Sequence, residues 1–390
     1  MKKVTVLTAT RAEYGLLKPV ILGLRQSGIV EVEVAVTGAH LSPEFGLTYR
    51  EIEKDGIDIA VKIPILLSSD SPAGVSKSMG LAMMGFADYF ETSKPDMLVV
   101  LGDRYETLAV CCAAVNARIP IAHLHGGETT EGAVDEAYRH AITKMSCLHF
   151  TATKDYRKRV IQLGENPNRV FNVGAVGVEN ALTLRLLSKD ELESSIGFDL
   201  DKPFACVTFH PVTLENNTAA EQTEELLNAL DEFPDMKFIF TKANADTDGR
   251  VINKLIDDYV AKHSNAVAFT SLGVVRYLST VKYAEMVIGN SSSGLVEVPS
   301  FHIPTVNIGD RQKGRIKADS VIDCRPVKDE IAEAIRLAQS SEFKESCAHV
   351  VNPYGGGNTR EAIVKTILDT LENGIDIKKK FYDVSYEVNK

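Results

Sequence analysis

The stretch MLVVLGDRYE, residues 97–106, decides the fold. Its first five residues, Met97–Leu101, are all apolar, and Gly-Asp-Arg ends this run before a helical pattern begins near residue 104. A strand that is apolar at every position, rather than at alternate positions, is buried on both of its faces. The segment therefore predicts a parallel sheet with helices on both sides.

The same alternation of short apolar runs and amphipathic segments extends in both directions. In the first half we expect strands at Val4–Leu7, Val32–Val36, Met97–Leu101 and Ile119–Leu124, and helices near 15–27, 45–54, 75–93, 104–117 and 136–145. In the second half we expect strands at Phe204–Phe209, Lys237–Phe240, Val267–Phe269, Met286–Ile288 and Thr305–Ile308. The fold class is therefore α/β, with two Rossmann-like doubly wound domains that join near the Gly-rich segment 172–179.

Length, charge and cysteine usage narrow the class of protein. A chain of 390 residues suits two domains. The net charge of −10 disfavours nucleic-acid binding. None of the six cysteines forms a CxxC pair, and no apolar run reaches the roughly 18 residues of a membrane span. We therefore expect a cytoplasmic protein with reduced thiols and no membrane partner.

Polar motifs follow the strands of the first half, where ligands bind in open α/β sheets. Asp103 and Arg104 could serve a proton transfer and a phosphate, or could simply cap the next helix. His123 and His125 lie two residues apart in HLHGGE, which predicts that both point to one face, and Glu128 ends that motif. We expect acid–base or substrate-positioning chemistry here.

A metal site is not expected in this region. Although His-x-His can chelate zinc, the chain has no HExxH and no Cys/His pair at finger spacing. Asp135, which could also cap a helix, instead adds to a group of carboxylates that could keep one acid protonated and another ionised.

The second half carries residues suited to an anionic ligand. His210 ends a strand, and Ser291 and Ser292 stand before a helix whose N–H groups could bind an anion. Glu297, one turn further on, suits ribose hydroxyls. Arg311 belongs to a run of three cations in five residues (311–315), and Arg11 adds a cation from the first half.

The absent motifs also restrict function. No GxGxxG follows a strand, and no GxxxxGK[ST] occurs, so nicotinamide binding and a P-loop are set aside. The serines lack the GxSxG pattern, which disfavours serine hydrolase chemistry.

Taken together, these motifs resemble the hydrolysing UDP-N-acetylglucosamine 2-epimerases of the bacterial sialic acid branch, over nearly the whole chain. The matching segments are TRAEYG at 10–15, TGAHLS at 37–42, LGDRYE at 101–106, HLHGGETTEGAVDEAYRHAITK at 123–144, FHP at 209–211, GNSSSGLVEVPS at 289–300 and NIGDRQKGR at 307–315. The resemblance implies a glycosyltransferase-B-like fold with a central cleft: an N-terminal domain at 1–173, a UDP-binding domain at 174–372, and a tail at 373–390 that packs on the first domain.

The resemblance also implies roles for single residues. It assigns catalysis to Asp103, Glu128, Asp135, His125 and His210. It assigns contacts with the UDP-sugar to Arg11, Arg104, Asn244, Ser291, Ser292, Glu297 and Arg311. Some relatives carry Glu where His125 stands, which leaves open whether His125 or Glu128 transfers the proton.

The implied reaction converts UDP-N-acetylglucosamine and water to N-acetylmannosamine and UDP, by anti elimination to 2-acetamidoglucal and then hydration. It needs no cofactor, and the family forms homodimers or homotetramers. Alternative readings are a hydrolysing UDP-N,N'-diacetylbacillosamine 2-epimerase, a non-hydrolysing 2-epimerase, a glycosyltransferase and a non-catalytic nucleotide-sugar sensor.

Overall fold

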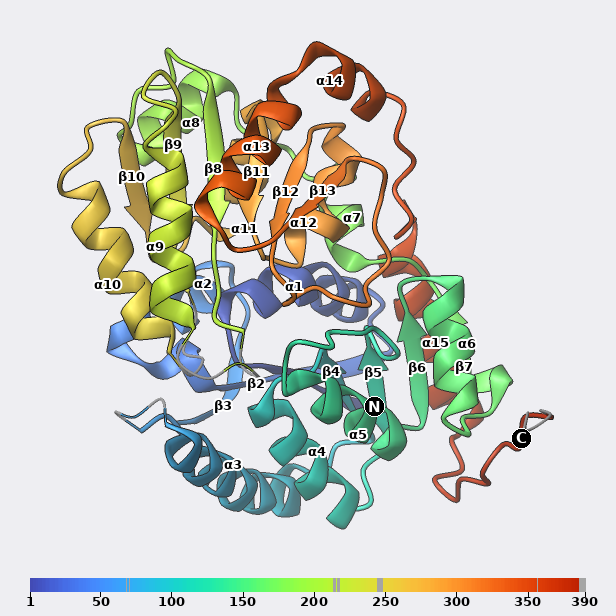
Figure 1. The fold of residues 1–390 in the computed structure, drawn as a ribbon. Helices are drawn as coiled ribbons and strands as arrows, with labels where there is room; N and C mark the ends of the chain where they lie inside the picture. Colours follow the sequence, from blue (N-terminus) through green and yellow to red (C-terminus); the bar gives the residue numbers. More distant parts are fainter. Residues whose placement is uncertain are drawn as a thin grey trace. The chain divides into compact units, whose positions relative to one another are not determined.

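The computed structural model describes residues 1–67, 69, 71–212, 215, 218–243, 248–355 and 357–385 (Figure 1). These residues form two compact units. Unit 1 contains 1–128, 135–176 and the segment that begins at 354, and unit 2 contains 129–134 and 177–353. Among the described residues, none of the helices is a candidate membrane span.

Among the described residues of unit 1, seven strands form one sheet in the order β3-β2-β1-β4-β5-β6-β7, and every neighbouring pair is parallel. The strands are β1 Lys2–Thr8, β2 Val30–Thr37, β3 Ile59–Ile63, β4 Met97–Leu101, β5 Ile121–Leu124, β6 Leu148–Thr151 and β7 Val170–Asn172. The helices are α1 Arg11–Gln26, α2 Tyr49–Lys54, α3 Pro72–Ser93, α4 Tyr105–Asn116, α5 Asp135–Met145, α6 Lys154–Gln162 and α15 Thr359–Asn373, with the 3₁₀ turns η1 Gly38–Leu41, η2 Pro43–Phe45 and η3 Pro167–Arg169.

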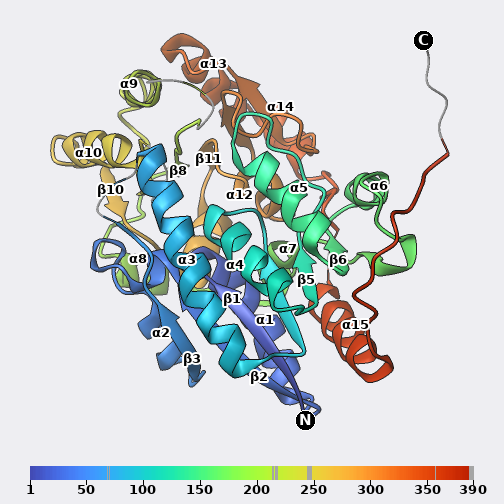
Figure 2. The ribbon, with the colours of Figure 1, turned by 90° about the horizontal axis from the view of Figure 1, so that it is seen from below.

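Strand β4 shows why both faces of this sheet are covered. Met97, Val99 and Leu101 belong to a core that includes residues of α1 and α15, whereas Leu98 and Val100 belong to a second core with α3, α4 and α5. Figure 2 shows α3, α4 and α5 side by side. Since successive side chains of a strand point to opposite faces, all five residues become buried.

The part of unit 2 that the structure describes has a sheet of six parallel strands in the order β10-β9-β8-β11-β12-β13. The strands are β8 Phe204–Thr208, β9 Lys237–Thr241, β10 Ala266–Phe269, β11 Met286–Gly289, β12 Thr305–Ile308 and β13 Val321–Cys324. The helices are α8 Lys189–Ile196, α9 Ala219–Leu230, α10 Gly249–Val260, α11 Gly273–Tyr283, α12 Ser293–Val296, α13 Lys328–Gln339 and α14 Ser341–Cys347, with the 3₁₀ turn η4 Val298–Phe301; α7 Val176–Thr183 begins at the unit boundary.

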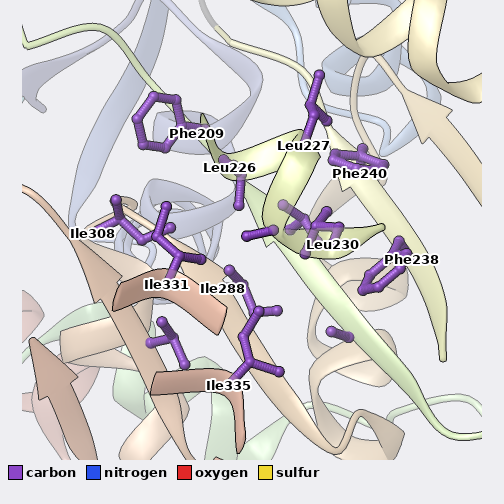
Figure 3. Close-up of a cluster of buried hydrophobic side chains, with 14 of the residues drawn as sticks. Phe209, Leu226, Leu227, Leu230, Phe238, Phe240, Ile288, Ile308, Ile331 and Ile335 are labelled. Atoms are coloured by element: carbon purple, nitrogen blue, oxygen red, sulfur yellow. The ribbon is translucent and has the colours of Figure 1, made fainter. Parts of the chain in front are cut away.

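Hydrophobic clusters also cover both faces of the sheet in the described part of unit 2. Figure 3 shows the larger one, in which side chains from α9 and α13 pack over the strands. Ala205 and Val207 of β8 face this core, and Cys206 between them faces a smaller cluster on the other side. Phe209, which directly follows β8, also packs into the larger core and anchors the start of the loop that carries His210 (Figure 3).

The predicted α/β class with two parallel sheets is confirmed. Each predicted strand is present within two residues of its predicted ends. The sequence missed β3, β6, β7 and β13. Of these, β3 and β13 are edge strands with partly exposed residues, β7 has three residues, and β6 has four residues that include His149 and Thr151, so none presents a long apolar run.

The compact units differ from the predicted division at the C-terminus. Residues 354–372 were expected in the second domain, but α15 belongs to unit 1 because Ile363, Ile367 and Leu371 pack into the core beside α1. The two helices approach closely at Gly23, where a Cβ would lie 2.9 Å from Val364. The segment after α15 also lies on unit 1, where the backbone N–H of Tyr382 donates to the carbonyl of Gly164 at 2.9 Å.

Gly289 offers a test of strand packing in unit 2. It has φ 130°, and a Cβ there would lie 1.9 Å from the carbonyl oxygen of Thr208. We expect Gly289→Ala to lower the free energy of unfolding by about 2 kcal/mol or more, since backbone must move in addition to the φ strain. Gly28→Ala is the control, because Gly28 also has positive φ (65°) but no atom within 4 Å of the added Cβ. Equal losses in urea denaturation would contradict the packing explanation.

Candidate active site

Arg139 of α5 organises the candidate site of unit 1. The guanidinium is 1% exposed and pairs with the carboxylate of Asp103, directly after β4. Its Nη1 donates to the carbonyl of Glu128 at 3.0 Å and to the carboxylate of Glu136 at 2.6 Å. Because a buried charge needs several partners, Arg139 fixes the loops after β4 and β5 against the start of α5. Asp103 and the backbone of Glu128 therefore meet at one guanidinium.

His125 and Glu128 form a hydrogen-bonded pair beside this cation. Nδ1 of His125 lies 2.9 Å from Oε1 of Glu128, and Nε2 lies 3.4 Å from the backbone N of Val176. Since that N–H can only donate, Nε2 is the acceptor and Nδ1 carries the proton. The side chains are 14% and 4% exposed. The arrangement makes Glu128 a hydrogen-bond acceptor, which is the state required of a base.

His123 and His125 do not share a face, so this expectation was wrong. Strand β5 ends at Leu124, and His125 has φ 66°, which turns its side chain away from the strand pattern. His123 is fully buried, with Nε2 2.7 Å from the carbonyl of Gly102 and Nδ1 3.2 Å from Oγ1 of Thr143. Burial lowers the pKa of His123 to about 3. It is therefore a neutral structural residue that holds the Gly102–Asp103 turn.

Arg104 faces two buried carboxyl groups. Its Nε donates to Oε1 of Glu106 at 2.7 Å and lies 3.9 Å from Oε1 of Glu13. Glu13, in the first turn of α1, helps to cap that helix: its N–H donates to Oγ1 of the N-cap residue Thr10 at 3.3 Å, and its Oε2 accepts from the N–H of Ala9 at 2.8 Å. Burial and the charge of Glu106 raise the pKa of Glu13 to about 7.

Arg11, the other predicted phosphate ligand of this unit, pairs with a carboxylate on α2. Its Nη2 lies 2.7 Å from Oε1 of Glu51, and the Arg11 side chain is 21% exposed. A phosphate that binds here would share or replace this partner. Asp135, the remaining predicted acid, is the first residue of α5 and is half-buried, next to Glu136, which Arg139 binds.

The predicted residues of unit 2 follow β8, β11 and β12. His210 is 7% exposed. Ser291 and Ser292 precede α12, which has only four residues, so their hydroxyl and N–H groups rather than a long helix dipole must provide any anion binding. The carboxylate of Glu297 packs on Gly177, where a Cβ would lie 2.0 Å from Oε1.

The cations of the 311–315 run point to different places instead of forming one patch. Nη1 of Arg311 donates to the backbone carbonyl of Asn290 at 3.2 Å. Lys313 and Arg315 instead line a hollow of about 740 Å³ with Asp310 and Glu215, and Nζ of Lys313 lies 3.4 Å from the Asp310 carboxylate. Acids therefore balance the positive charge of this hollow, and Arg311 is the member directed at the loop after β11.

The segment after Glu128 supports the same loop. Residues 129–134 belong to unit 2, and the N–H of Glu131 donates to the carbonyl of Lys313 at 3.2 Å. Gly132 lies against the backbone of Asp310, where a Cβ would come within 2.7 Å of its carbonyl oxygen. Residues 129–134 therefore pack against the loop that carries Arg311, although Glu128 and Asp135, which flank this segment, belong to unit 1.

Comparison with known proteins identifies the family. Residues 23–368 match the sequence profile described as UDP-N-acetylglucosamine 2-epimerase. The chain belongs to the UDP-N-acetylglucosamine 2-epimerase family. It is therefore an enzyme of the epimerase type, and the acids and cations at the strand ends are candidates for its active site.

Individual relatives agree with this assignment. The chain is 43% identical to the GDP/UDP-N,N'-diacetylbacillosamine 2-epimerase (hydrolyzing) of Campylobacter jejuni, over 98% of this chain and 99% of that protein. It is 41% identical to the polysialic acid biosynthesis protein P7 of Escherichia coli, over 98% of both. The crystal structure of UDP-GlcNAc 2-epimerase from Neisseria meningitidis bound to UDP-GlcNAc has the same fold, with a TM-score of 0.79 and 21% identity over 95% of this chain and all of that one.

The structure brings several of the predicted site residues together and adds Arg139, which the sequence did not indicate. Five of the predicted residues lie in unit 1, in the loops after β4 and β5 or at the start of α5: Asp103, Arg104, His125, Glu128 and Asp135. Asn244 lies outside the described residues. Arg139 was missed as a site residue because a cation on a helix is usually solvated. Its spacing of three residues from Glu136 was the available signal. No group of three potential metal ligands occurs among the described residues.

Glu13 provides a test of this electrostatic arrangement. Its pKa is about 7 in the folded protein and 4.5 as a free side chain, so the folded state binds the proton more tightly. The contribution of this pKa shift to the free energy of unfolding is fully present below about pH 4.5 and is lost as the pH rises through 7. We expect wild type to lose stability relative to Glu13→Gln across this window in denaturant titrations.

Glu165→Gln is the control for that comparison. Burial opposes the shift, but hydrogen bonds from His149, Lys144 and Lys379 lower the pKa of Glu165 to about 2. The contribution of Glu165 to the free energy of unfolding is therefore lost on acidification below about pH 4.5 and is constant between pH 4.5 and 7. Parallel pH profiles for wild type and Glu13→Gln would show that folding does not raise the pKa of Glu13.

Proposed function

We propose that the enzyme is a hydrolysing UDP-N-acetylglucosamine 2-epimerase, which converts UDP-N-acetylglucosamine and water to N-acetylmannosamine and UDP. The observation that carries the proposal is the cluster of Asp103, Glu128 and His125 around Arg139, because C2 inversion needs more than one proton-transfer group. Family membership supplies the reaction type.

The proposed chemistry has two steps. In the first, a base removes the proton from C2, the C1–O bond breaks, and UDP leaves with the bonding electrons, which gives 2-acetamidoglucal. In the second, water attacks C1 and gives up a proton to a carboxylate, while an acid delivers a proton to C2 on the face opposite to the one from which the first proton was removed. Glu128 is suited to be the base, because the proton of His125 Nδ1 points at its carboxylate.

The other carboxylates and the cations complete the proposal. Asp103 and Asp135 are the candidates for the second proton transfer, and Arg139 orients the first of them. The leaving diphosphate gains charge, which Arg11, Arg104, Arg311 and His210 would stabilise. Ser291, Ser292, Glu297 and Asn244 would bind the rest of the UDP, and no cofactor is required.

A second substrate has specific support. The Campylobacter jejuni relative is named for UDP-N,N'-diacetylbacillosamine, and its 43% identity is close to the 41% of the polysialic acid protein, whose name fits the sialic acid branch. The second candidate function is therefore a hydrolysing UDP-N,N'-diacetylbacillosamine 2-epimerase. Both substrates carry a 2-acetamido group, so the same elimination and hydration apply.

One experiment tests both candidates against the other classes. Each UDP-sugar is incubated with the enzyme in D₂O and followed by NMR. We expect release of UDP and of the free C2-inverted sugar, with deuterium at C2. The substrate that is converted faster identifies which of the two candidate functions is correct. A C2-inverted sugar still attached to UDP would indicate a non-hydrolysing epimerase. No exchange at C2 with either substrate would contradict the proposal.

Asp103→Asn tests the catalytic cluster directly. We expect kcat to fall by about a hundredfold or more, since proton transfer typically contributes at least that factor, while UDP affinity changes little. Asp96→Asn is the matched control, because Asp96 also accepts hydrogen bonds in unit 1, from Lys2 Nζ and Lys3 N at 2.8 Å each, but precedes β4 instead of following it. Retained turnover in Asp103→Asn would remove this residue from the mechanism.

The remaining expectations concern assembly and location. We propose a homodimer or homotetramer, as expected for the family, in the cytoplasm where reduced thiols persist. The six cysteines are free. Light scattering of the purified chain measures the oligomeric state.

A further inference from the structure

Asn290 clamps the backbone of His210. It directly follows β11 and is fully buried. Its Oδ1 accepts the N–H of His210 at 2.7 Å, and its Nδ2 donates to the carbonyl of His210 at 2.8 Å. One side-chain amide therefore satisfies both main-chain groups of His210, at the start of the loop after β8, as a neighbouring strand would.

The main chain of Asn290 binds two further loops. Its N–H donates to the carbonyl of Thr208 at 3.1 Å. Its carbonyl accepts from Nη1 of Arg311 at 3.2 Å and from Nε2 of Gln312 at 2.8 Å, and Gln312 is also fully buried. The loops after β8, β11 and β12 therefore meet at this single residue.

The chemistry of these contacts requires asparagine. The side chain must donate and accept at once, so aspartate, which only accepts, would place its charge against the carbonyl of His210. Serine and alanine are too short to reach both groups. Burial increases the cost of any mismatch, because water cannot replace the lost partner.

We propose that Asn290 is a positioning residue of the reaction, which fixes His210 and Arg311 relative to each other. This inference rests on the proposed function, in which His210 and Arg311 stabilise the leaving diphosphate. Asn290 acts through these two residues, since its own hydrogen-bonding groups are occupied by protein. Its loss should therefore affect both UDP affinity and turnover.

The test is a double-mutant cycle with UDP. Calorimetry measures the Kd of UDP for wild type, Asn290→Asp, Arg311→Ala and the double variant. We expect Asn290→Asp to weaken UDP binding by roughly tenfold or more, and to weaken it little further once Arg311 is absent. We also expect Asn290→Asp to lower kcat in addition to changing KM, since the substitution displaces His210. Additive losses in the cycle, or an unchanged Kd, would overturn the proposal.

Asn265→Asp is the matched control. Nδ2 of Asn265 donates to the carbonyl of Met236 at 2.8 Å, in the same unit but before β9, at the opposite end of the sheet. It should lower stability without changing the Kd or kcat. An equal effect of both substitutions would indicate a merely structural role for Asn290. Should Asn290→Asp fail to fold, Asn290→Ser removes the same clamp without adding charge and is tested identically.

A ligand-free measurement separates this inference from the proposed function. Hydrogen–deuterium exchange should accelerate at the His210 amide and within 311–313 in Asn290→Asp, but not in Asn265→Asp. Failure of wild type to turn over either UDP-sugar would contradict the proposed function alone. Unchanged exchange in both loops of Asn290→Asp would contradict the positioning role, whatever the substrate is.

Discussion

Burial of both faces of each parallel sheet is the constraint on which the rest of this structure depends. Strand β4 supplies alternate side chains to two different cores, so helices must cover each face. Parallel strands in turn require crossover connections, which bring all their carboxyl ends to one edge. Polar residues that follow separate strands, such as Asp103 and Glu128, are thereby gathered although 25 positions separate them in the chain.

Strand-end loops carry polar groups into a partly buried region, and in each unit one residue binds several of these groups. In unit 1 the guanidinium of Arg139 binds Asp103, Glu136 and the carbonyl of Glu128. In unit 2 Asn290 binds His210 and, through its carbonyl, Arg311. Arg139 pairs with carboxylates, whereas the side chain of Asn290 hydrogen-bonds the backbone of His210. Both residues thereby hold candidate catalytic groups in fixed positions.

Glu13 and Glu106 show that the buried charges of unit 1 are not all matched. The guanidinium of Arg104 lies close to both carboxyl groups, 3.9 Å from that of Glu13 and 2.7 Å from that of Glu106. Burial raises the energy of a second negative charge, and the pKa of Glu13 rises accordingly. The helix cap at Thr10 and the phosphate-binding candidate Arg104 are thus electrostatically linked, which no local motif would suggest.

The sequence by itself determined the fold class, the strand-end positions and the family, because continuous apolar runs and their following motifs are local signals. It placed β4 at Met97–Leu101 and pointed to Asp103, His125 and His210. Tertiary structure alone decided the partners: that His123 is structural, that α15 packs on unit 1, and that Arg139 and Asn290 join separate loops. These outcomes depend on contacts between residues distant in the chain, whereas periodicity and spacing report only on neighbours.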